Sequence, residues 1–189
     1  MNKKYKLPIN MYIILEHANP VIYSSSALQT NHFVILIDSI YLKSTAQIFK
    51  NEVHFAKSLL IESSSVDTLD YTKHTKEFEL FFKNSRILTY YIFYFYKLKL
   101  RITLVCYNNN NPLESIDLIY KNANWLEREV SEMFNVYFIN KRDSRKLLLD
   151  YTLDINPMLR DYPTEGEFDC YYSNIENQVV LENFDAVEL

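Results

Sequence analysis

The chain has 189 residues, of which 48% are hydrophobic, so it is long enough for one domain with a sizeable core. Its formal net charge of −4 argues against a nucleic-acid partner or an anionic membrane surface, because both attract basic proteins. Cys106 and Cys170 are too few to ligate an iron–sulfur cluster, and with the four histidines they show no zinc-site spacing. They form no disulfide framework either, which favours a reducing compartment.

Residue usage is strongly skewed. Phe, Tyr, Met, Ile, Asn and Lys, which have AT-rich codons, greatly outnumber Gly, Ala, Arg and Pro, which have GC-rich codons. This skew indicates an AT-rich genome of the kind found in organelles.

The first 29 residues begin with three lysines and a short apolar stretch, but no small-residue cleavage site follows. The apolar stretch is too short and too interrupted to span a bilayer. We therefore expect no membrane span here. We expect a short helix packed on the domain, followed by a serine-rich loop at 24–26.

The first strong strand signal is at residues 32–38, where five consecutive apolar side chains are typical of a central strand buried on both faces. A helix capped by Asp38 or Ser39 is predicted to run to about Lys50. A second strand is predicted at 59–67. Its three serines have no histidine or aspartate in a recognisable arrangement nearby, so they indicate no nucleophile.

Residues 68–86 are polar and predict a loop with one helical turn at 77–83. Residues 87–106 combine a β-prone aromatic run with strict alternation, which predicts a β-hairpin. We assign its aromatic residues to sheet faces rather than to stacking on nucleic acid, because the net charge has the wrong sign. A turn at 108–111 then leads into a short amphipathic helix that begins at Pro112.

The next helix is predicted to begin at Asn124, with Glu127 completing a capping box. Apolar residues at helical spacing, together with the tryptophan, are expected to face the core: Trp125, Leu126, Val130, Met133, Phe134 and Tyr137. The remaining positions predict a solvent-facing side: Glu127, Arg128, Ser131 and Glu132. The adjacent charges at 127–129 point in different directions on a helix, so they favour ion pairs with neighbouring segments over acid–base chemistry.

Helical and strand periodicity both end near Phe138. Four basic residues follow within 141–146, and the last 29 residues carry eight acids and no Lys or Arg. Pro157 and Pro163 favour an extended path. We predict an α+β fold: a domain at 1–138, with a mixed sheet of about four strands and helices on one face, followed by an extended C-terminal arm at 139–189. The arm keeps apolar residues without periodicity, so we expect it to wrap a neighbouring subunit rather than its own domain.

The stretch from Ala123 to Pro163 contains about a dozen motif residues in a fixed register. It resembles the 30-kDa subunit of respiratory complex I, the NADH:ubiquinone oxidoreductase, in its mitochondrially encoded type. The family signature in the helix comprises Trp125, Glu127, Arg128, Glu129, Met133 and Phe134. The motif residues of the arm, to which we assign partner binding, are Arg145, Lys146, Asp150, Tyr151, Pro157, Arg160, Asp161, Tyr162 and Pro163.

The chain departs from the family pattern at several positions. The family has glycine where this chain has Asn135, Thr152 and Ile155, and His-Pro where it has Lys141-Arg142. Asparagine tolerates a positive φ, so Asn135 is expected to serve in a turn. Thr152 and Ile155 are β-branched, so we expect the backbone to differ locally there.

The resemblance implies a core subunit of the quinone module in the peripheral arm of complex I, which gives structural support to the large quinone-site subunit. It implies no catalytic residue, cofactor or metal in this chain, with FMN, iron–sulfur clusters and quinone held by neighbouring subunits. The expected partners are the large quinone-site subunit and other peripheral-arm subunits, with no nucleic acid, so the chain is not a free monomer. The expected location is the matrix side of the mitochondrial inner membrane.

Two alternatives remain open from the sequence. One is the equivalent subunit of a plastid NDH complex or of a membrane-bound hydrogenase. The other is an unrelated stand-alone enzyme in which the motif is structural. Native size and co-purifying subunits distinguish these alternatives.

Overall fold

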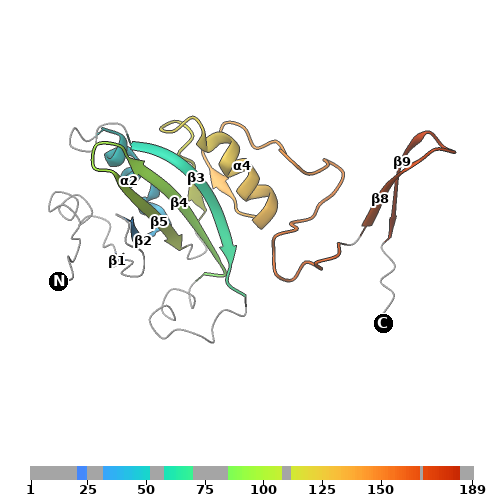
Figure 1. Ribbon diagram of the computed structural model, residues 1–189, viewed down its shortest axis with the longest axis horizontal. Coiled ribbons are helices and arrows are strands. Elements are labelled where there is room, and N and C mark those ends of the chain that lie inside the picture. Colours follow the sequence, from blue (N-terminus) through green and yellow to red (C-terminus); the bar gives the residue numbers. More distant parts are fainter. Residues whose placement is uncertain are drawn as a thin grey trace.

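A computed structural model describes residues 21–24, 32–51, 58–69, 85–107, 112–166 and 168–183. These residues form a mixed sheet with two α-helices, continued by an arm that ends in a separate β-hairpin (Figure 1). The predicted α+β class is therefore confirmed. The helix expected near the N-terminus and the turns expected at 77–83 and 108–111 lie outside the described residues.

The main sheet has five strands in the order β1-β2-β5-β4-β3, one more than expected. The strands are β1 (Val21–Ser24), β2 (His32–Asp38), β3 (Ser58–Asp67), β4 (Ile87–Phe95) and β5 (Leu100–Tyr107). β2 runs parallel to β5, whereas every other neighbouring pair is antiparallel. The predicted inner position of β2 and the predicted β4–β5 hairpin are both confirmed.

The additional strand is β1, whose place was expected to hold a helix and a serine-rich loop. It pairs antiparallel with β2, with Val21 opposite Leu36 and Ser24 opposite Phe33. Four residues between a proline and a serine run carry too little pattern to predict a strand. The neighbouring edge of β2 supplies the pairing partner that local propensity does not reveal.

The core is organised around β4, on which Tyr91, Phe93 and Phe95 are fully buried on one face. Helix α2 (Leu42–Asn51) covers this face, after the short 3₁₀ helix η2 (Ser39–Tyr41). The Phe49 ring meets Phe93 and Phe95 edge-on, with centroids 5.3 and 5.1 Å apart. Such aromatic pairs add about 0.5–1.5 kcal/mol to the free energy of burial. The capping role predicted for Asp38 is confirmed, because its carboxylate accepts from the Ile40 N–H.

The short helix expected after Pro112 is not formed. Instead, β6 (Leu113–Glu114) pairs in parallel with β7 (Phe138–Ile139), and turns follow from 117. Ile116 and Tyr120 are still buried, so the apolar spacing was identified correctly but assigned to the wrong element. The backbone here is fixed by long-range partners, including the Glu127 carboxylate that accepts from the Ile116 N–H.

Helix α4 (Ala123–Phe134) packs alongside β3, the edge strand of the sheet (Figure 1). It begins one residue before the predicted Asn124 cap. Asn122 stands at the N-cap position, but its side chain accepts no hydrogen bond from the helix and instead donates to the Leu60 carbonyl of β3. Asn135 ends the helix with φ of 56°, which confirms the turn expected where the family has glycine.

Two predictions about the faces of α4 are wrong. Trp125 and Tyr137 were expected in the core but are 65% and 71% exposed. Glu127, Arg128 and Glu132 were expected in solvent but are buried. The helix lies between the sheet and the arm, so the arm covers the face of the helix that points away from the sheet. Val130 and Phe134 are buried and Met133 packs against the core, as predicted.

Candidate docking surface and the contacts that shape it

The first contact behind α4 is an ion pair between Glu127 and Lys141. Lys141 Nζ lies 3.0 Å from Glu127 Oε2, and the two side chains are 3% and 0% exposed. Ser115 Oγ and the Ile116 N–H also donate to this carboxylate, at 2.6 and 2.9 Å. Burial raises the pKa of Glu127, although these donors and Lys141 act in the opposite direction. The carboxylate therefore depends on its partners to stay ionised.

Arg128 fixes the start of the arm. Its Nε donates to the Arg145 carbonyl at 2.7 Å, and its Nη2 donates to the Lys146 carbonyl at 2.9 Å. Its Nη1 lies 3.5 Å from the carboxylate of Asp143. A guanidinium with several donors in one plane is suited to hold two consecutive carbonyls.

Glu132 holds the next three residues of the arm through their backbone. Its carboxylate accepts from the N–H groups of Leu147, Leu148 and Leu149, at 2.6 and 2.9 Å for the first two. Its own carbonyl accepts from Asn156 Nδ2 at 2.7 Å. Burial alone would raise the pKa of Glu132, but the three N–H donors outweigh it and hold the pKa below its usual value. Successive N–H groups converging on one anion form a nest.

A second cluster fastens the arm to the end of β3. Arg86 forms a two-point contact with Asp67, with Nε and Nη2 at 3.0 and 2.7 Å from its two oxygens, and also bonds Asp161 at 2.7 Å. The Arg160 N–H donates to Asp67, and Arg160 Nη1 donates to the Leu69 carbonyl. The hydrogen bonds that Asp67 accepts, first of all those from Arg86, lower its pKa to about 2.

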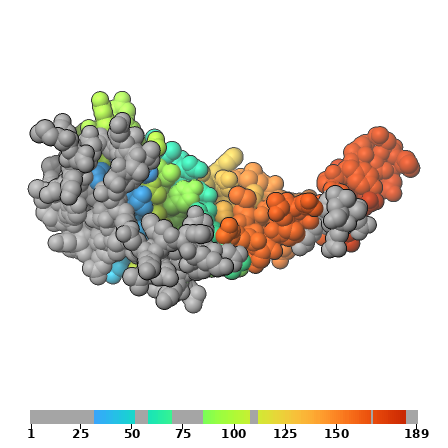
Figure 2. Space-filling model, turned by 60° about the horizontal axis from the view of Figure 1, so that its bottom comes forward, coloured from blue at the N-terminus to red at the C-terminus, as the bar shows by residue number. Residues whose placement is uncertain are grey.

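Residues 141–161, which we call the anchored segment, therefore contact their own domain. The expectation that the arm avoids its own domain is wrong for this segment. The anchored segment follows β7, which ends at Ile139. Beyond Gly166 the arm continues into the hairpin of β8 (Phe168–Ser173) and β9 (Gln178–Asn183), which stands away from the domain (Figures 1 and 2).

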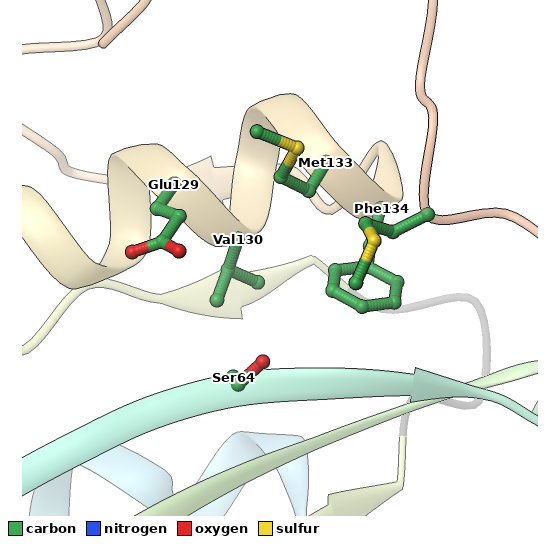
Figure 3. Close-up of a pocket in the computed structure, with 6 residues that line it drawn as sticks. Ser64, Glu129, Val130, Met133 and Phe134 are labelled. Carbon is green, nitrogen blue, oxygen red and sulfur yellow. The ribbon is translucent and has the colours of Figure 1, made fainter. Parts of the chain in front are cut away.

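A small cavity lies between α4, β3 and the anchored segment. Its volume is about 160 Å³, and it is lined by Ser64, Glu129, Val130, Met133, Phe134 and Met158. Figure 3 shows Val130 and Phe134 pointing from the helix toward β3, with Ser64 on the strand opposite them. The Met158 N–H donates to the Met133 carbonyl at 3.2 Å, which holds the segment over this end of the helix.

The arm residues assigned to partner binding divide into two groups. The first is exposed and consists of Arg145, Asp150, Tyr151, Arg160, Asp161 and Pro163; the second is partly buried and consists of Lys146, Pro157 and Tyr162. Tyr151 is 69% exposed, which leaves its ring available as an anchor for a partner. The exposed basic and aromatic side chains therefore project from a backbone that is hydrogen-bonded to the domain.

The signature residues of α4 divide in the same way. Trp125 and Glu129 are exposed one turn apart, whereas Glu127, Arg128 and Phe134 are buried. Two signature residues, Glu127 and Arg128, therefore bond the arm through their side chains, whereas Phe134 belongs to the core. The two exposed members add to the surface.

Several residues that shape the surface were not identified from the sequence. Asp67, Arg86 and Glu132 form the contacts that fasten the arm, and Arg142 Nε lies 3.0 Å from the fully buried Asp117. An acidic residue at the end of a predicted strand, such as Asp67, indicates in the sequence that a polar contact forms there. Its partners Arg86 and Arg160 cannot be read from spacing, because they lie 19 and 93 residues away.

Within the described residues, no group of three or more His, Cys, Asp or Glu side chains is arranged as a metal site. No described helix is both long and apolar enough to cross a membrane.

The fold and the contacts define an α+β domain whose C-terminal arm is fastened to its last helix. The family model described as respiratory-chain NADH dehydrogenase, 30-kDa subunit, matches residues 35–168. The chain belongs to this family. NADH-ubiquinone oxidoreductase subunit 9 of Paramecium primaurelia is 33% identical over 98% of this chain and 88% of its own length.

Two solved structures share the fold. A trypsin-resistant fragment of Nqo5 has a TM-score of 0.53 and 19% identity, covering 71% of this chain and 99% of its own. A chain of the membrane-bound sulfane sulfur reductase, an archaeal respiratory membrane complex, has a TM-score of 0.60 and 17% identity, covering 82% and 84%.

Proposed function

We propose that the protein is a core subunit of the quinone module in the peripheral arm of the proton-pumping NADH:ubiquinone oxidoreductase. Its role is the structural support of the large quinone-site subunit. The observation that carries this proposal is the family match over residues 35–168, which includes the whole of α4 and the anchored segment.

The contacts of α4 suit a mechanical role. Arg128 and Glu132 fix the backbone of residues 145–149, so the exposed Arg145 and Tyr151 are presented on a preorganised segment. A binding surface that is ordered before association loses less conformational entropy on docking. The arm then docks on the large quinone-site subunit, with other peripheral-arm subunits beside it.

In this proposal the chain itself carries no catalytic residue, cofactor or metal, and FMN, iron–sulfur clusters and quinone belong to neighbouring subunits. Two cysteines in the whole chain are compatible with this division of labour. The subunit 9 relatives support a mitochondrial location, and the matrix side of the inner membrane follows from the peripheral-arm assignment.

The experiment is a native-size measurement on the tagged chain in mitochondria. We expect the tag to migrate with the intact complex and with NADH:quinone oxidoreductase activity, and metal analysis of the isolated chain to find no stoichiometric iron or zinc. A chain that migrates alone, or that binds iron with visible absorption, would contradict the proposal. An untagged strain is the control for non-specific recovery.

A further inference from the structure

The β8–β9 hairpin begins at residue 168, where the match to the family model ends. Apart from Phe168, it therefore lies outside the residues that the family model matches. The alignment to the Paramecium primaurelia relative spans 186 residues of this chain and so extends into the hairpin.

The register of the hairpin separates its side chains into two faces. Phe168 pairs with Asn183, Cys170 with Leu181, and Tyr172 with Val179. Directly opposed residues share a face in an antiparallel pair, and the faces alternate along each strand. One face, the apolar face, therefore carries Phe168, Cys170, Tyr172, Val179 and Leu181, with Asn183 as its one polar member at the open end of the hairpin. The other, the polar face, carries Asp169, Tyr171, Ser173, Gln178, Val180 and Glu182.

The two faces differ in the contacts that their side chains already make within the hairpin. On the polar face the Tyr171 hydroxyl donates to Glu182 Oε1 at 2.8 Å, so the aromatic ring is tied to an acid within the hairpin. On the apolar face Tyr172 is 57% exposed and Val179 62% exposed. A two-stranded hairpin is only marginally stable in water, and a one-sided apolar surface needs a cover to become stable.

We infer that the apolar face of the hairpin is a docking surface for another subunit of the complex, on a patch that is apolar at its centre and bordered by Lys or Arg. The charge of the hairpin selects this partner. Residues 168–183 contain Asp169, Glu176 and Glu182 and no basic residue. The hairpin of a second copy would bring like charges together, which opposes association of two hairpins. This inference rests on the proposed function, but it concerns a surface separate from the anchored segment.

The chain carries a natural probe of this surface. Cys170 is exposed on the apolar face, whereas Cys106 is buried in the core, so a maleimide reagent distinguishes the two in the folded protein. We expect the Cys170 thiol to react readily in the isolated full-length chain. In the assembled complex its reaction should slow by about tenfold or more, because a covered thiol is inaccessible to the reagent.

The matched control moves the thiol by one residue to the opposite face. In a chain with Cys170→Ser and Asp169→Cys, the introduced thiol should stay reactive after assembly. Equal reactivity of Cys170 in the free and assembled chain would overturn the inference, as would equal protection of both positions. Protection of Cys170 already in the isolated chain would indicate self-association and would overturn it as well.

Two adjacent valines give a second test. Val179 lies on the apolar face and Val180 on the polar face, so Val179→Asp and Val180→Asp make the same chemical change on opposite sides. We expect Val179→Asp to release the subunit from the complex at lower salt or detergent than Val180→Asp. Equal effects would show that only hairpin formation had been disturbed. A wild-type chain that never enters the complex would instead contradict the proposed function.

Discussion

Lys141 and Glu127 form an ion pair that is almost completely removed from water, with 3.0 Å between Nζ and Oε2. The lysine comes from the arm and the glutamate from α4, so the pair joins the two parts of the structure. Lys141 stands where the family has histidine in the resemblance described above. The lysine side chain here reaches both the carboxylate and the Asn124 carbonyl.

Removing one member of this pair should destabilise the fold strongly. Lys141→Met leaves the Glu127 carboxylate buried without its cation, and we expect a loss of about 3–5 kcal/mol in the free energy of unfolding. Urea denaturation of the isolated chain measures it. Lys121→Met, at an exposed position just before α4, is the matched control and should change stability by less than about 0.5 kcal/mol. The double variant Glu127→Gln with Lys141→Met should lose less than the sum of the single changes, because the two residues are in contact.

Glu132→Gln should loosen the arm without unfolding the domain. The amide oxygen keeps fewer acceptor sites for the three N–H groups of residues 147–149, and loss of a charge-assisted hydrogen bond costs about 1.5–3 kcal/mol. Hydrogen exchange should become faster at 147–149 while the amides of β4 stay protected. Glu129→Gln, exposed on the same helix, is the control and should leave the exchange of 147–149 unchanged. Protection that persists in Glu132→Gln would show that other contacts hold this segment.

Asp67 should make stability depend on pH in the acid range. Its pKa is about 2 in the folded chain, below the ordinary value of 3.8. A lowered carboxyl pKa contributes stability that is fully present above about pH 4 and is lost as the pH falls toward 2. The side chain is 1% exposed, so we expect a contribution of about 2 kcal/mol. Between pH 5 and pH 2 the wild type should lose about this much more stability than Asp67→Asn. Asp154→Asn, at an exposed arm position, should follow the wild-type profile.

Arg145→Glu should impair assembly while the domain still folds. Arg145 contacts Asp143 but remains 73% exposed, so its charge is available to a partner. Truncating a charge that is buried at an interface costs about 2–5 kcal/mol. Native gels should show less assembled complex, and circular dichroism of the isolated chain should be unchanged. Arg101→Glu, on the exposed side of β5, reverses the same charge and should assemble normally. Normal assembly of Arg145→Glu would place the docking surface elsewhere.

The sequence predicted those parts of the fold whose pattern is local. β2, β3 and the β4–β5 hairpin follow from apolar runs and strict alternation, and α4 follows from helical spacing. The sequence did not predict β1, β6 or β7, because each is short and depends on a partner strand. The apolar spacing at Ile116 and Tyr120 was therefore assigned to a helix, although turns and an extended segment bury the same side chains. The sequence also missed the β8–β9 hairpin, which forms where only an extended arm was predicted.

The candidate surface was predictable as a region but not as a set of contacts. The basic and aromatic residues of the arm, such as Arg145 and Tyr151, are exposed as a docking surface requires. Helical spacing placed Glu127 and Glu132 in solvent, because a charged residue is normally exposed. Their burial depends on N–H groups and cations supplied by the arm, whose path has no period in the sequence. Docking of residues 145–163 on a neighbouring subunit stays a prediction.

The contacts of Arg128 and Glu132 also determine the order in which the chain can be completed. A ribosome delivers α4 before residues 145–149, so the helix emerges with a cation and an anion that still lack their backbone partners. Water must hydrogen-bond to these side chains until residues 145–149 have been synthesised. Until then, the contacts between the helix and those residues cannot form. Any chain cut short before residue 145 keeps both charges without these partners and should be recognised as unfinished by the proteases that survey newly made proteins. The packing around α4 is therefore complete only when residues 145–149 have been added to the chain.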